Sequence, residues 1–334
     1  MSPDKLNTRY ALLDFSRLFA AILVVGFHIS SGKNELLNLG YLAVDYFFVL
    51  SGYVLAPQIE RVTDRSRLIT FAKQRYRRLI PNTALSLLLV AIIALSIWSF
   101  GSQSAMVWNN FNVVSVLSYI TFTSVFVTSS IALNYPIWSL STEFIINCCS
   151  ALIRIGLKRP IQVILFFASI PVSYFTIVNY FNLDLAPLWV EPLLRTASGF
   201  AVGYLTRLFV ATKQSKILNT TIFLTAIFLL LSGNLSLGVQ CLGATLLSLV
   251  FRSQTKWTSP KIAYAGVISG ELSFLVYLLH VPLLGVIDIV EKKTHLFTAP
   301  ELYVQVPLRV SLILIICLLV MMLRAMAPRR SGKQ

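Results

Sequence analysis

Charged side chains are scarce in this sequence. Of its 334 residues only 12% are Asp, Glu, Lys or Arg, whereas 56% are hydrophobic. A soluble domain carries about a quarter charged residues, so the composition excludes an ordinary soluble enzyme, a disordered chain and a nucleic-acid module built on a charged surface. It indicates an all-α polytopic membrane protein, a bundle of transmembrane helices whose apolar side chains are covered by lipid.

Cysteine and histidine are also rare, with four and three residues. All four cysteines lie inside apolar runs, and their spacing does not match a zinc site. We therefore expect no metal centre and no disulfide on an extracellular face. A cleavable signal peptide is not expected either, because the first apolar run contains Asp14, Arg17 and His28.

Ten stretches of mostly apolar residues are each long enough to cross a bilayer as a helix, which takes about 20 residues. Pro81, Pro136 and Pro192 stand near the beginnings of three of them, where proline is best tolerated in a helix. Segment 111–133 is apolar but rich in Ser and Thr, and is either an eleventh span or a re-entrant or surface helix on the outer side. The ten predicted spans cover residues 11–30, 39–57, 81–100, 136–155, 161–180, 192–211, 217–233, 235–251, 264–287 and 305–326.

Lys and Arg gather on one side of these spans. With a cytoplasmic N-terminus, 22 of the 28 Lys and Arg residues fall in cytoplasmic segments, three in outer loops and three within spans. Because positive residues favour the cytoplasmic side, this split predicts that both termini are cytoplasmic. It also accounts for the net charge of +15 without nucleic acid. An eleventh span at 111–133 would move three basic loops outside, so the charge distribution favours the outer, non-spanning interpretation.

The sequence contains no internal repeat, low-complexity tract or soluble domain, so we expect a single membrane-embedded domain over residues 1–334. The only long polar segment is 58–80, between the second and third spans. The longest outer stretch, 101–135, has no charged residue.

The first span carries three ionisable residues on one stripe. Arg17 and His28 are eleven residues apart, which on a helix returns to within about 20° of the same face, and Asp14 precedes Arg17 by three residues. A charge within a span costs at least ~2.5 kcal/mol on insertion scales, so its default interpretation is functional. The alternative is an Asp14–Arg17 pair that neutralises itself beside a hydrogen-bonded, structural His28.

Four further ionisable residues are expected at the same depth as His28, near the outer side of the bilayer: Asp45, Glu143, Arg195 and His280. They come from four different helices, and independent structural charges would not be expected to share a depth. The pattern predicts a polar chamber open to the outer face. We expect catalytic roles for Asp45 and Glu143 beside His28, and substrate contacts for Arg195 and His280. The alternative for Arg195 and His280 is that they pair only to hold the bundle together.

A basic segment lies just before the third span, where residues 71–81 read FAKQRYRRLIP. Arg75 and Arg78 are three residues apart and so share a helix face. Paired arginines suit a phosphorylated ligand through bidentate N–H contacts. The alternative is a juxtamembrane segment that touches anionic lipid.

Five blocks of this sequence, in order over residues 14–280, resemble the acyltransferase family 3, a family of integral-membrane O-acyltransferases. The first block runs from Asp14 to His28 and contains an Arg, ten residues and a His. The other blocks are YLAVDYFFVLSGY at 41–53, RYRRLIP at 75–81, WSLSTE at 138–143 and SFLVYLLH at 273–280. The sequence departs mildly from the family pattern at two places. Thr142 precedes a lone Glu143 where many members have two adjacent acids, and Phe274 stands where Tyr is frequent.

The resemblance implies transfer of an acyl group, usually acetyl, from cytoplasmic acyl-CoA to a hydroxyl of an extracytoplasmic sugar in a polysaccharide or lipid-linked glycan. It implies a bacterial inner-membrane location, acyl-CoA as co-substrate and no tightly bound cofactor. The family's essential His and partner cation map to His28 and Arg17, and its donor-associated arginines map to Arg75 and Arg78. Some members carry a soluble esterase-like domain, which we do not expect here.

In this chemistry His28 is either the general base or the acyl carrier, and a carboxylate fixes its tautomer. The sequence does not separate direct transfer from an acyl-histidine relay. A transporter or flippase for an anionic or sugar substrate is the main alternative function, because it also needs intramembrane charges and a basic inner mouth. A structural subunit of an envelope-polysaccharide assembly is a third alternative.

Overall fold

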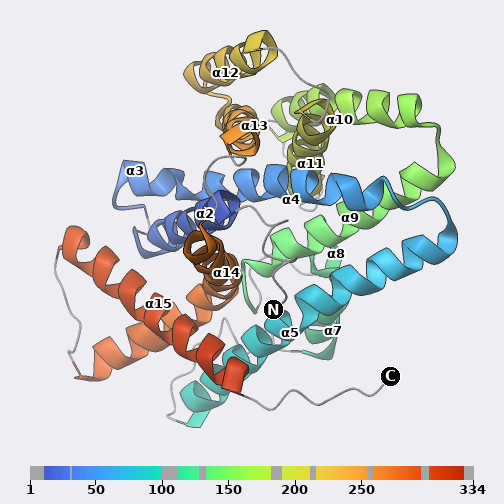
Figure 1. Ribbon diagram of the computed structural model, residues 1–334. Coiled ribbons are helices and arrows are strands. Elements are labelled where there is room, and N and C mark those ends of the chain that lie inside the picture. The colour runs from blue at the N-terminus through green and yellow to red at the C-terminus, as the bar shows by residue number, and fades with distance from the viewer. Residues whose placement is uncertain are drawn as a thin grey trace. The chain divides into compact units, whose positions relative to one another are not determined.

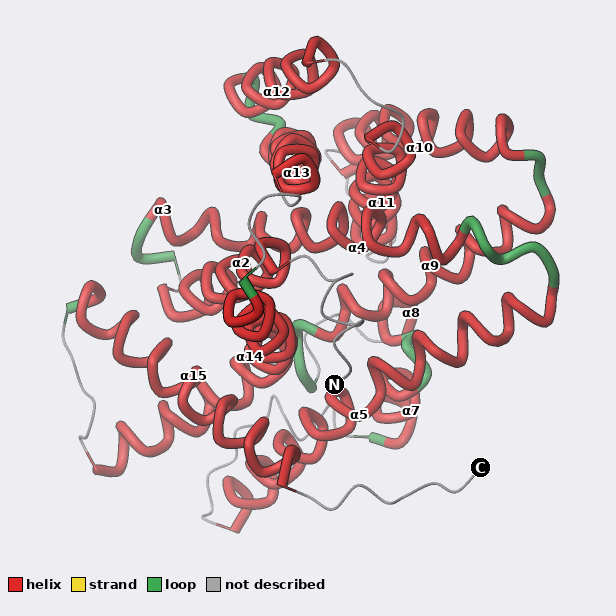
Figure 2. Tube along the Cα trace, viewed as in Figure 1, coloured by secondary structure: helices red, strands yellow, loops and turns green. Residues whose placement is uncertain are grey.

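The computed structural model describes residues 11–30, 32–99, 112–127, 133–181, 190–210, 216–253, 259–294 and 301–326. Within these ranges the chain forms helices and connecting turns and no strand (Figure 2), so the all-α prediction is confirmed. The chain divides into two compact units, one made of Met1–Tyr41 with Ser259–Gln334 and the other of Leu42–Thr258.

The first unit is built around two helices that pack along each other, α2 (Ala11–Ser30) and α14 (Pro260–Thr294) (Figure 1). A third helix, α15 (Leu302–Met326), packs against both. The short α3 (Glu35–Asn38) contacts α2 and is followed by the 3-10 helix η1 (Leu39–Leu42).

Two glycines allow α2 and α14 to approach closely. A Cβ atom at Gly266 would overlap Ala11, and one at Gly270 would overlap the carboxylate of Asp14. Small residues four apart let membrane helices bring their backbones together. The close approach is what brings side chains of α14 against the ionisable stripe of α2.

The second unit centres on α4 (Ala43–Ile59), which packs against α9, α11 and α13. A buried apolar cluster joins α4 to its neighbours and includes Leu55, Phe166, Phe200 and Tyr204. In addition, α5 packs on α9, α10 on α11 and α12 on α13. The bounds of these helices are α5 (Arg65–Ser99), α7 (Val113–Ile120), α8 (Ser124–Val127), α9 (Ile137–Gly156), α10 (Arg159–Phe181), α11 (Val190–Val210), α12 (Lys216–Leu231) and α13 (Leu235–Ser253).

A helix stands at each of the ten stretches predicted to span the membrane. Among the described helices, α9 and α11 carry polar and charged side chains, and the apolar parts of α12 and α13 are shorter than a span. The number of crossings therefore stays a prediction, as does the cytoplasmic location of the termini. Six stretches within the described residues are long and apolar enough to cross a bilayer: Ala11–Ser30, Glu35–Ile59, Arg65–Leu95, Arg159–Ile177, Pro260–Glu291 and Leu302–Met326.

The prediction that Pro81 stands near the beginning of a helix is wrong. Helix α5 starts well before Pro81, so the basic segment is helical and continuous with the apolar span. Asp64 explains the early start: its side chain accepts a hydrogen bond of 2.9 Å from the Arg67 backbone N–H, which caps the helix. The same bond lowers the pKa of Asp64. Pro136 and Pro192 do stand at helix starts, at the N-cap of α9 and in the first turn of α11.

Segment 111–133 contains two short helices in its described part, α7 and α8, of eight and four residues. Neither is long enough to cross a bilayer. The chain turns between them at Phe122, whose φ is +58°, and the two helices pack on α5 and α9. The structure therefore supports the non-spanning interpretation of this segment. Residues 128–132, and most of the uncharged stretch before α7, lie outside the described residues.

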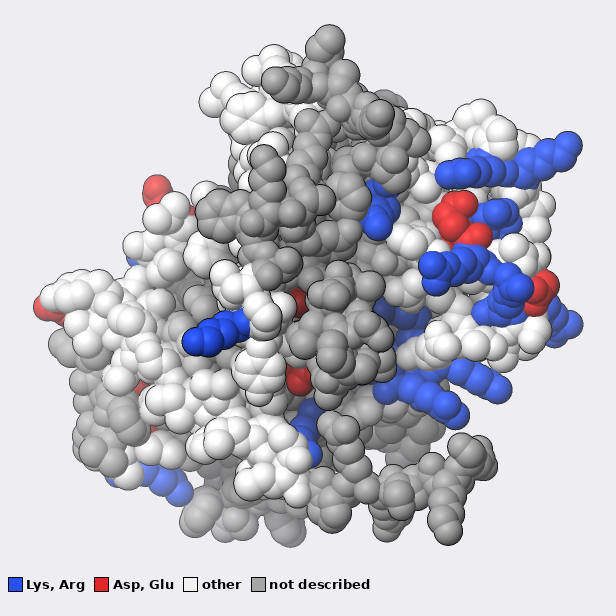
Figure 3. Space-filling model, viewed as in Figure 1, with Lys and Arg blue, Asp and Glu red and all other residues white. Residues whose placement is uncertain are grey.

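Lys and Arg side chains gather where α4 connects to α5 and where α9 connects to α10 (Figure 3). Glu60, at the end of α4, lies 3.7 Å from both Arg154 and Arg159. The ion pairs bring together two connections that the charge distribution had assigned to one side of the membrane.

Candidate functional site

Two histidines face each other in the first unit, His28 from α2 and His280 from α14. Nε2 of His280 lies 3.4 Å from Nδ1 of His28, and the ring centroids are 4.9 Å apart. His280 is fully buried, whereas His28 keeps part of its surface exposed. His280 therefore offers its nitrogen to His28 rather than to a ligand, which does not support the predicted substrate contact of His280.

Backbone carbonyls fix the proton positions in both rings. Nδ1 of His28 lies 2.9 Å from the Val24 carbonyl oxygen, and Nδ1 of His280 lies 2.7 Å from that of Tyr277. A carbonyl oxygen only accepts hydrogen bonds, so in the neutral rings each Nδ1 carries the hydrogen and each Nε2 carries the lone pair. Nε2 is therefore the basic nitrogen of His28. Its Nδ1–H also lies within reach of the lone pair on His280.

Asp14 and Arg17 form the expected pair on the same helix as His28. Nη1 of Arg17 lies 3.9 Å from Oδ1 of Asp14. Asp14 is buried against Gly270 of α14, whereas 23% of the Arg17 side chain is exposed. The pair thus holds the Arg17 guanidinium near Asp14, while part of the Arg17 side chain stays exposed.

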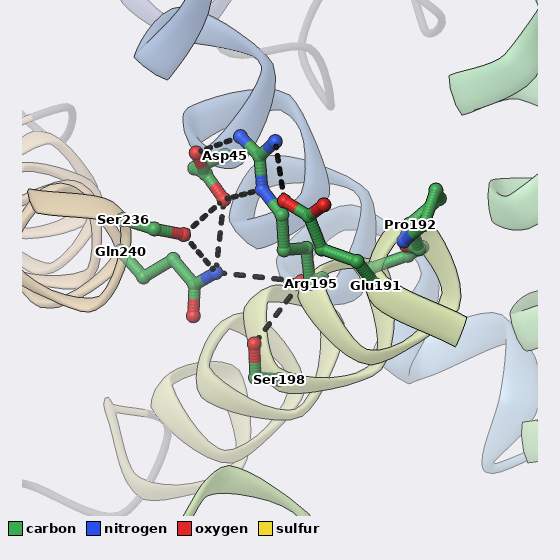
Figure 4. A network of polar contacts seen from close by, with 8 residues as sticks. Asp45, Glu191, Pro192, Arg195, Ser198, Ser236 and Gln240 are labelled. Carbon is green, nitrogen blue, oxygen red and sulfur yellow. Dashed lines mark hydrogen bonds and ion pairs between the residues drawn. The ribbon is translucent and has the colours of Figure 1, made fainter. Parts of the chain in front are cut away.

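Asp45 sits at the centre of a polar network in the second unit (Figure 4). It is fully buried, and Nη2 of Arg195 donates to its Oδ2 at 2.6 Å. Ser236 Oγ and Gln240 Nε2 donate to its Oδ1 at 2.6 and 3.1 Å, while Glu191 lies 3.8 Å from Arg195. Because these donors come from α11 and α13, the network ties three helices together. This geometry supports the alternative in which Arg195 pairs to hold the bundle together.

Arg75 and Glu143 form an ion pair between α5 and α9, with Nη2 of Arg75 2.8 Å from Oε1 of Glu143. Ser51 Oγ donates to the same oxygen at 2.8 Å. We expected Arg75 at the cytoplasmic mouth and Glu143 in an outer layer, and this separation is wrong, because the two side chains are at one level. Arg75 and Arg78, which we expected to share a helix face, differ in exposure: Arg75 is buried and Arg78 is exposed.

A cavity of about 250 Å³ opens beside this ion pair. It is lined by Ala72, Lys73, Tyr76 and Arg77 of α5 and by Phe144 of α9. In the described part of the chain, no group of three or more His, Cys, Asp and Glu side chains is arranged to hold a metal ion.

Sequence reasoning missed the uncharged partners in these sites. Ser51, Ser236 and Gln240 each hydrogen-bond a carboxylate, yet none was predicted to take part. The available signal was their position as polar residues inside apolar spans, where a polar side chain needs a partner.

Two curated relatives match parts of the chain. Acyltransferase MdmB of Streptomyces mycarofaciens is 28% identical over 141 residues, which is 38% of this chain and 35% of that protein. Protein 2 in the picA locus of Rhizobium radiobacter is 35% identical over 95 residues, which is 28% of this chain and 50% of that protein. The chain thus spans about a third and a half of the lengths of these relatives. No solved structure matches it significantly.

A family comparison covers far more of the chain. The sequence profile of the acyltransferase family 3, described as an acyltransferase domain, matches residues 10–326. This range contains every described helix, and with them the His28–His280 pair, the Asp45–Arg195 network and the Arg75–Glu143 pair. The apolar helices of the chain agree with a family of membrane proteins. Sequence profile and helical architecture together show that the chain belongs to the acyltransferase family 3 and is an integral membrane protein.

Proposed function

We propose that the protein is a membrane acyltransferase that moves an acyl group, specifically acetyl, from cytoplasmic acyl-CoA to a hydroxyl of an extracytoplasmic sugar. Membership in the acyltransferase family 3 supports the reaction class. The observation that carries the proposal is the His28–His280 pair, because it presents a partly exposed imidazole whose basic nitrogen is Nε2. Because acyl-CoA is cytoplasmic and the acceptor is outside, we place the enzyme in the bacterial inner membrane.

In direct transfer, Nε2 of His28 takes the proton from the acceptor hydroxyl, whose oxygen attacks the thioester carbonyl. The C–S bond breaks, and the departing CoA thiolate receives this proton from Nε2. In a relay, Nε2 attacks the thioester itself and carries the acyl group until the acceptor hydroxyl displaces it. The hydroxyl proton then ends on the CoA thiolate. Either route puts positive charge on His28, and the lone pair of His280 stabilises that charge by accepting the Nδ1–H.

The donor side of the proposal uses the basic segment of α5. Arg78 is exposed and available to the phosphates of CoA, whereas Arg75 is buried against Glu143 and positions α5. Arg17 lies eleven residues before His28 on the same helix face, or about 16 Å along the axis. We assign it to the passage along which the thioester reaches His28.

The test is transfer of radiolabelled acetyl from acetyl-CoA into surface glycan, with wild type, His28→Ala and His295→Ala compared in membranes. His295 lies outside the described residues and serves as the matched histidine control. His28→Ala is expected to insert and bind CoA but to lose about 10²–10⁴-fold of the transfer rate, while His295→Ala keeps it. A His28→Ala variant that binds CoA and transfers within a few-fold of wild type would remove His28 from the mechanism.

The same assay separates the two routes and the alternative function. Without acceptor, a relay leaves label on the wild-type protein but not on His28→Ala, whereas direct transfer labels neither. A transporter would bind no CoA and would leave acetyl-CoA intact in the presence of acceptor.

A further inference from the structure

Three aromatic rings meet where α2 ends. The ring of Phe27 lies 4.9 Å from the imidazole of His28 and 5.9 Å from the ring of Tyr41, centroid to centroid. Phe27 and His28 are half-buried, whereas 37% of the surface of Tyr41 is exposed. All three residues belong to the first unit. Phe27 therefore connects an accessible aromatic surface to the imidazole that carries the proposed reaction.

The segment that presents Tyr41 folds back onto α2. Its helix α3 contacts α2 (Figure 1), and Ser30 Oγ at the end of α2 lies 3.1 Å from Oδ1 of Asn38. Gly40 lies directly on the backbone of α2, because a Cβ atom there would overlap the carbonyl oxygen of Leu23. The position of Tyr41 is therefore set by close packing of the neighbouring residue against α2.

Asn38 adds a polar group on the same side as Tyr41. The chain stays helical from Asn38 to Tyr41, through the end of α3 and η1, so side chains three positions apart point in similar directions. Asn38 is half-buried. Ser30 contacts one of the two polar atoms of its amide, and within the described residues the other atom makes no hydrogen bond. An aromatic surface and an amide that can still bond a ligand thus lie together beside His28.

We propose that Tyr41, Phe27 and Asn38 form the subsite that holds the sugar ring of the acceptor beside His28. The face of an aromatic ring is electron-rich and attracts the weakly positive C–H groups on one face of a sugar. An amide bonds the hydroxyls at the rim of the same sugar and fixes its orientation. A neighbouring hydroxyl of that sugar is then the one presented to His28. This inference rests on the proposed function and names the residues that select its acceptor.

Two other roles of these rings are separated from sugar binding by the experiment. Tyr is common where membrane proteins meet the lipid headgroups, but a tyrosine in that role needs neither the contact through Phe27 to His28 nor the amide of Asn38. The acyl group of the donor could lie against the rings, but an apolar acyl group has no use for the amide either. The combination of rings and amide is what favours a sugar.

The test measures transfer from radiolabelled acetyl-CoA by the full chain in nanodiscs, with surface glycan freed of its acyl groups by mild alkali as the acceptor. Tyr41→Leu is expected to raise the KM for glycan about 10-fold, because the sugar loses its aromatic surface, and to leave the KM for acetyl-CoA unchanged. Tyr41→Phe keeps the ring and should stay within two-fold of wild type. Asn38→Ala should raise the KM for glycan roughly 3–10-fold, as for loss of one hydrogen bond. Tyr303→Leu, at an exposed tyrosine of α15 in the same unit, is the matched control and should change either KM less than two-fold.

Thermal unfolding of each variant shows whether a loss of activity comes from misfolding, and Phe27→Leu decides the question if Tyr41→Leu does not fold. A folded Tyr41→Leu or Phe27→Leu with the wild-type KM for glycan overturns the assignment and leaves Tyr41 in the lipid headgroup region. A rise in the KM for acetyl-CoA instead of glycan also overturns it and assigns the rings to the acyl group. In both cases transfer by the wild type continues, so the proposed function stands. A wild type that transfers no label to the glycan removes the proposed function and the subsite together.

Discussion

Nδ1 of His28 and Nε2 of His280 are 3.4 Å apart, although 252 positions separate the two residues in the sequence. His280 is fully buried and its own Nδ1 is held by backbone carbonyls, so its Nε2 lone pair faces His28. His280 therefore acts on the proposed reaction through His28, as a positioning residue.

Replacing His280 tests this relationship. His280→Phe keeps the ring volume but removes the acceptor, so we expect the turnover rate to fall about 10–100-fold, as for loss of a hydrogen bond to a charged group, with the KM for acetyl-CoA unchanged. His280→Gln, which retains an acceptor, should keep more activity. Transfer by wild type should fall at acidic pH, because a protonated His28 accepts no further proton.

The pH profile distinguishes this role from simple packing. In His280→Phe the acidic fall should move to lower pH, because His28 loses the acceptor that stabilises its protonated form, whereas in His280→Gln it should move less. A His280→Phe enzyme with wild-type turnover and an unmoved profile would make His280 a packing residue only.

Arg75 and Arg78 should respond differently to substitution. Arg75→Ala leaves the Glu143 carboxylate without its cation, which typically costs about 3–5 kcal/mol in buried surroundings, so the unfolding temperature should drop sharply. Arg78→Ala should keep the unfolding temperature and weaken acyl-CoA binding. Scanning calorimetry and CoA binding in detergent measure the two effects. An Arg75→Ala protein as stable as Arg78→Ala would show that the ion pair does not support the fold.

Substitutions at Asp45 and Arg195 distinguish a structural role of this ion pair from a catalytic role of Asp45. Asp45→Leu removes the buried carboxylate that pairs with Arg195 and accepts hydrogen bonds from Ser236 and Gln240, so we expect a marked loss of thermal stability. The double variant Asp45→Leu/Arg195→Met removes both charges and should recover much of it, because a buried ion pair is often replaceable by apolar side chains. If the pair only holds the helices, transfer recovers with stability. If Asp45 is catalytic, as the sequence predicts, stability recovers and transfer does not.

Cysteine labelling tests the predicted topology. With the four native cysteines replaced by Ala, single cysteines at Thr63 and Lys158 should react only with reagent on the cytoplasmic side, because Glu60 ties their two connections together. Cysteines at Gly32 and Val113 should react from outside. If Lys158→Cys were labelled from outside while Thr63→Cys was protected, the charge-based orientation would be contradicted. The same result would contradict the Glu60 ion pairs that join the α4–α5 connection to the α9–α10 connection.

The sequence by itself determined the helices and the ionisable stripe of α2. Apolar runs and helical spacing are local properties, so they predicted a helix at each of ten positions and placed Asp14, Arg17 and His28 on one face. The distribution of Lys and Arg between the two sides of the predicted spans is likewise a property of the sequence and does not depend on how the helices pack. Apolar runs do not mark the start of α5, because its first half is polar and its N-terminus is defined by the Asp64 cap.

Only the tertiary structure decided which ionisable groups meet. A span fixes the approximate depth of a residue but neither the helix it faces nor its pairing, and the partners lie 252, 150 and 68 positions apart in the His28–His280, Asp45–Arg195 and Arg75–Glu143 pairs. These contacts depend on how closely helices pack, as the glycines of α14 against α2 illustrate. A buried charge takes whichever partner that packing brings within reach, because leaving it unpaired costs more than the pairing.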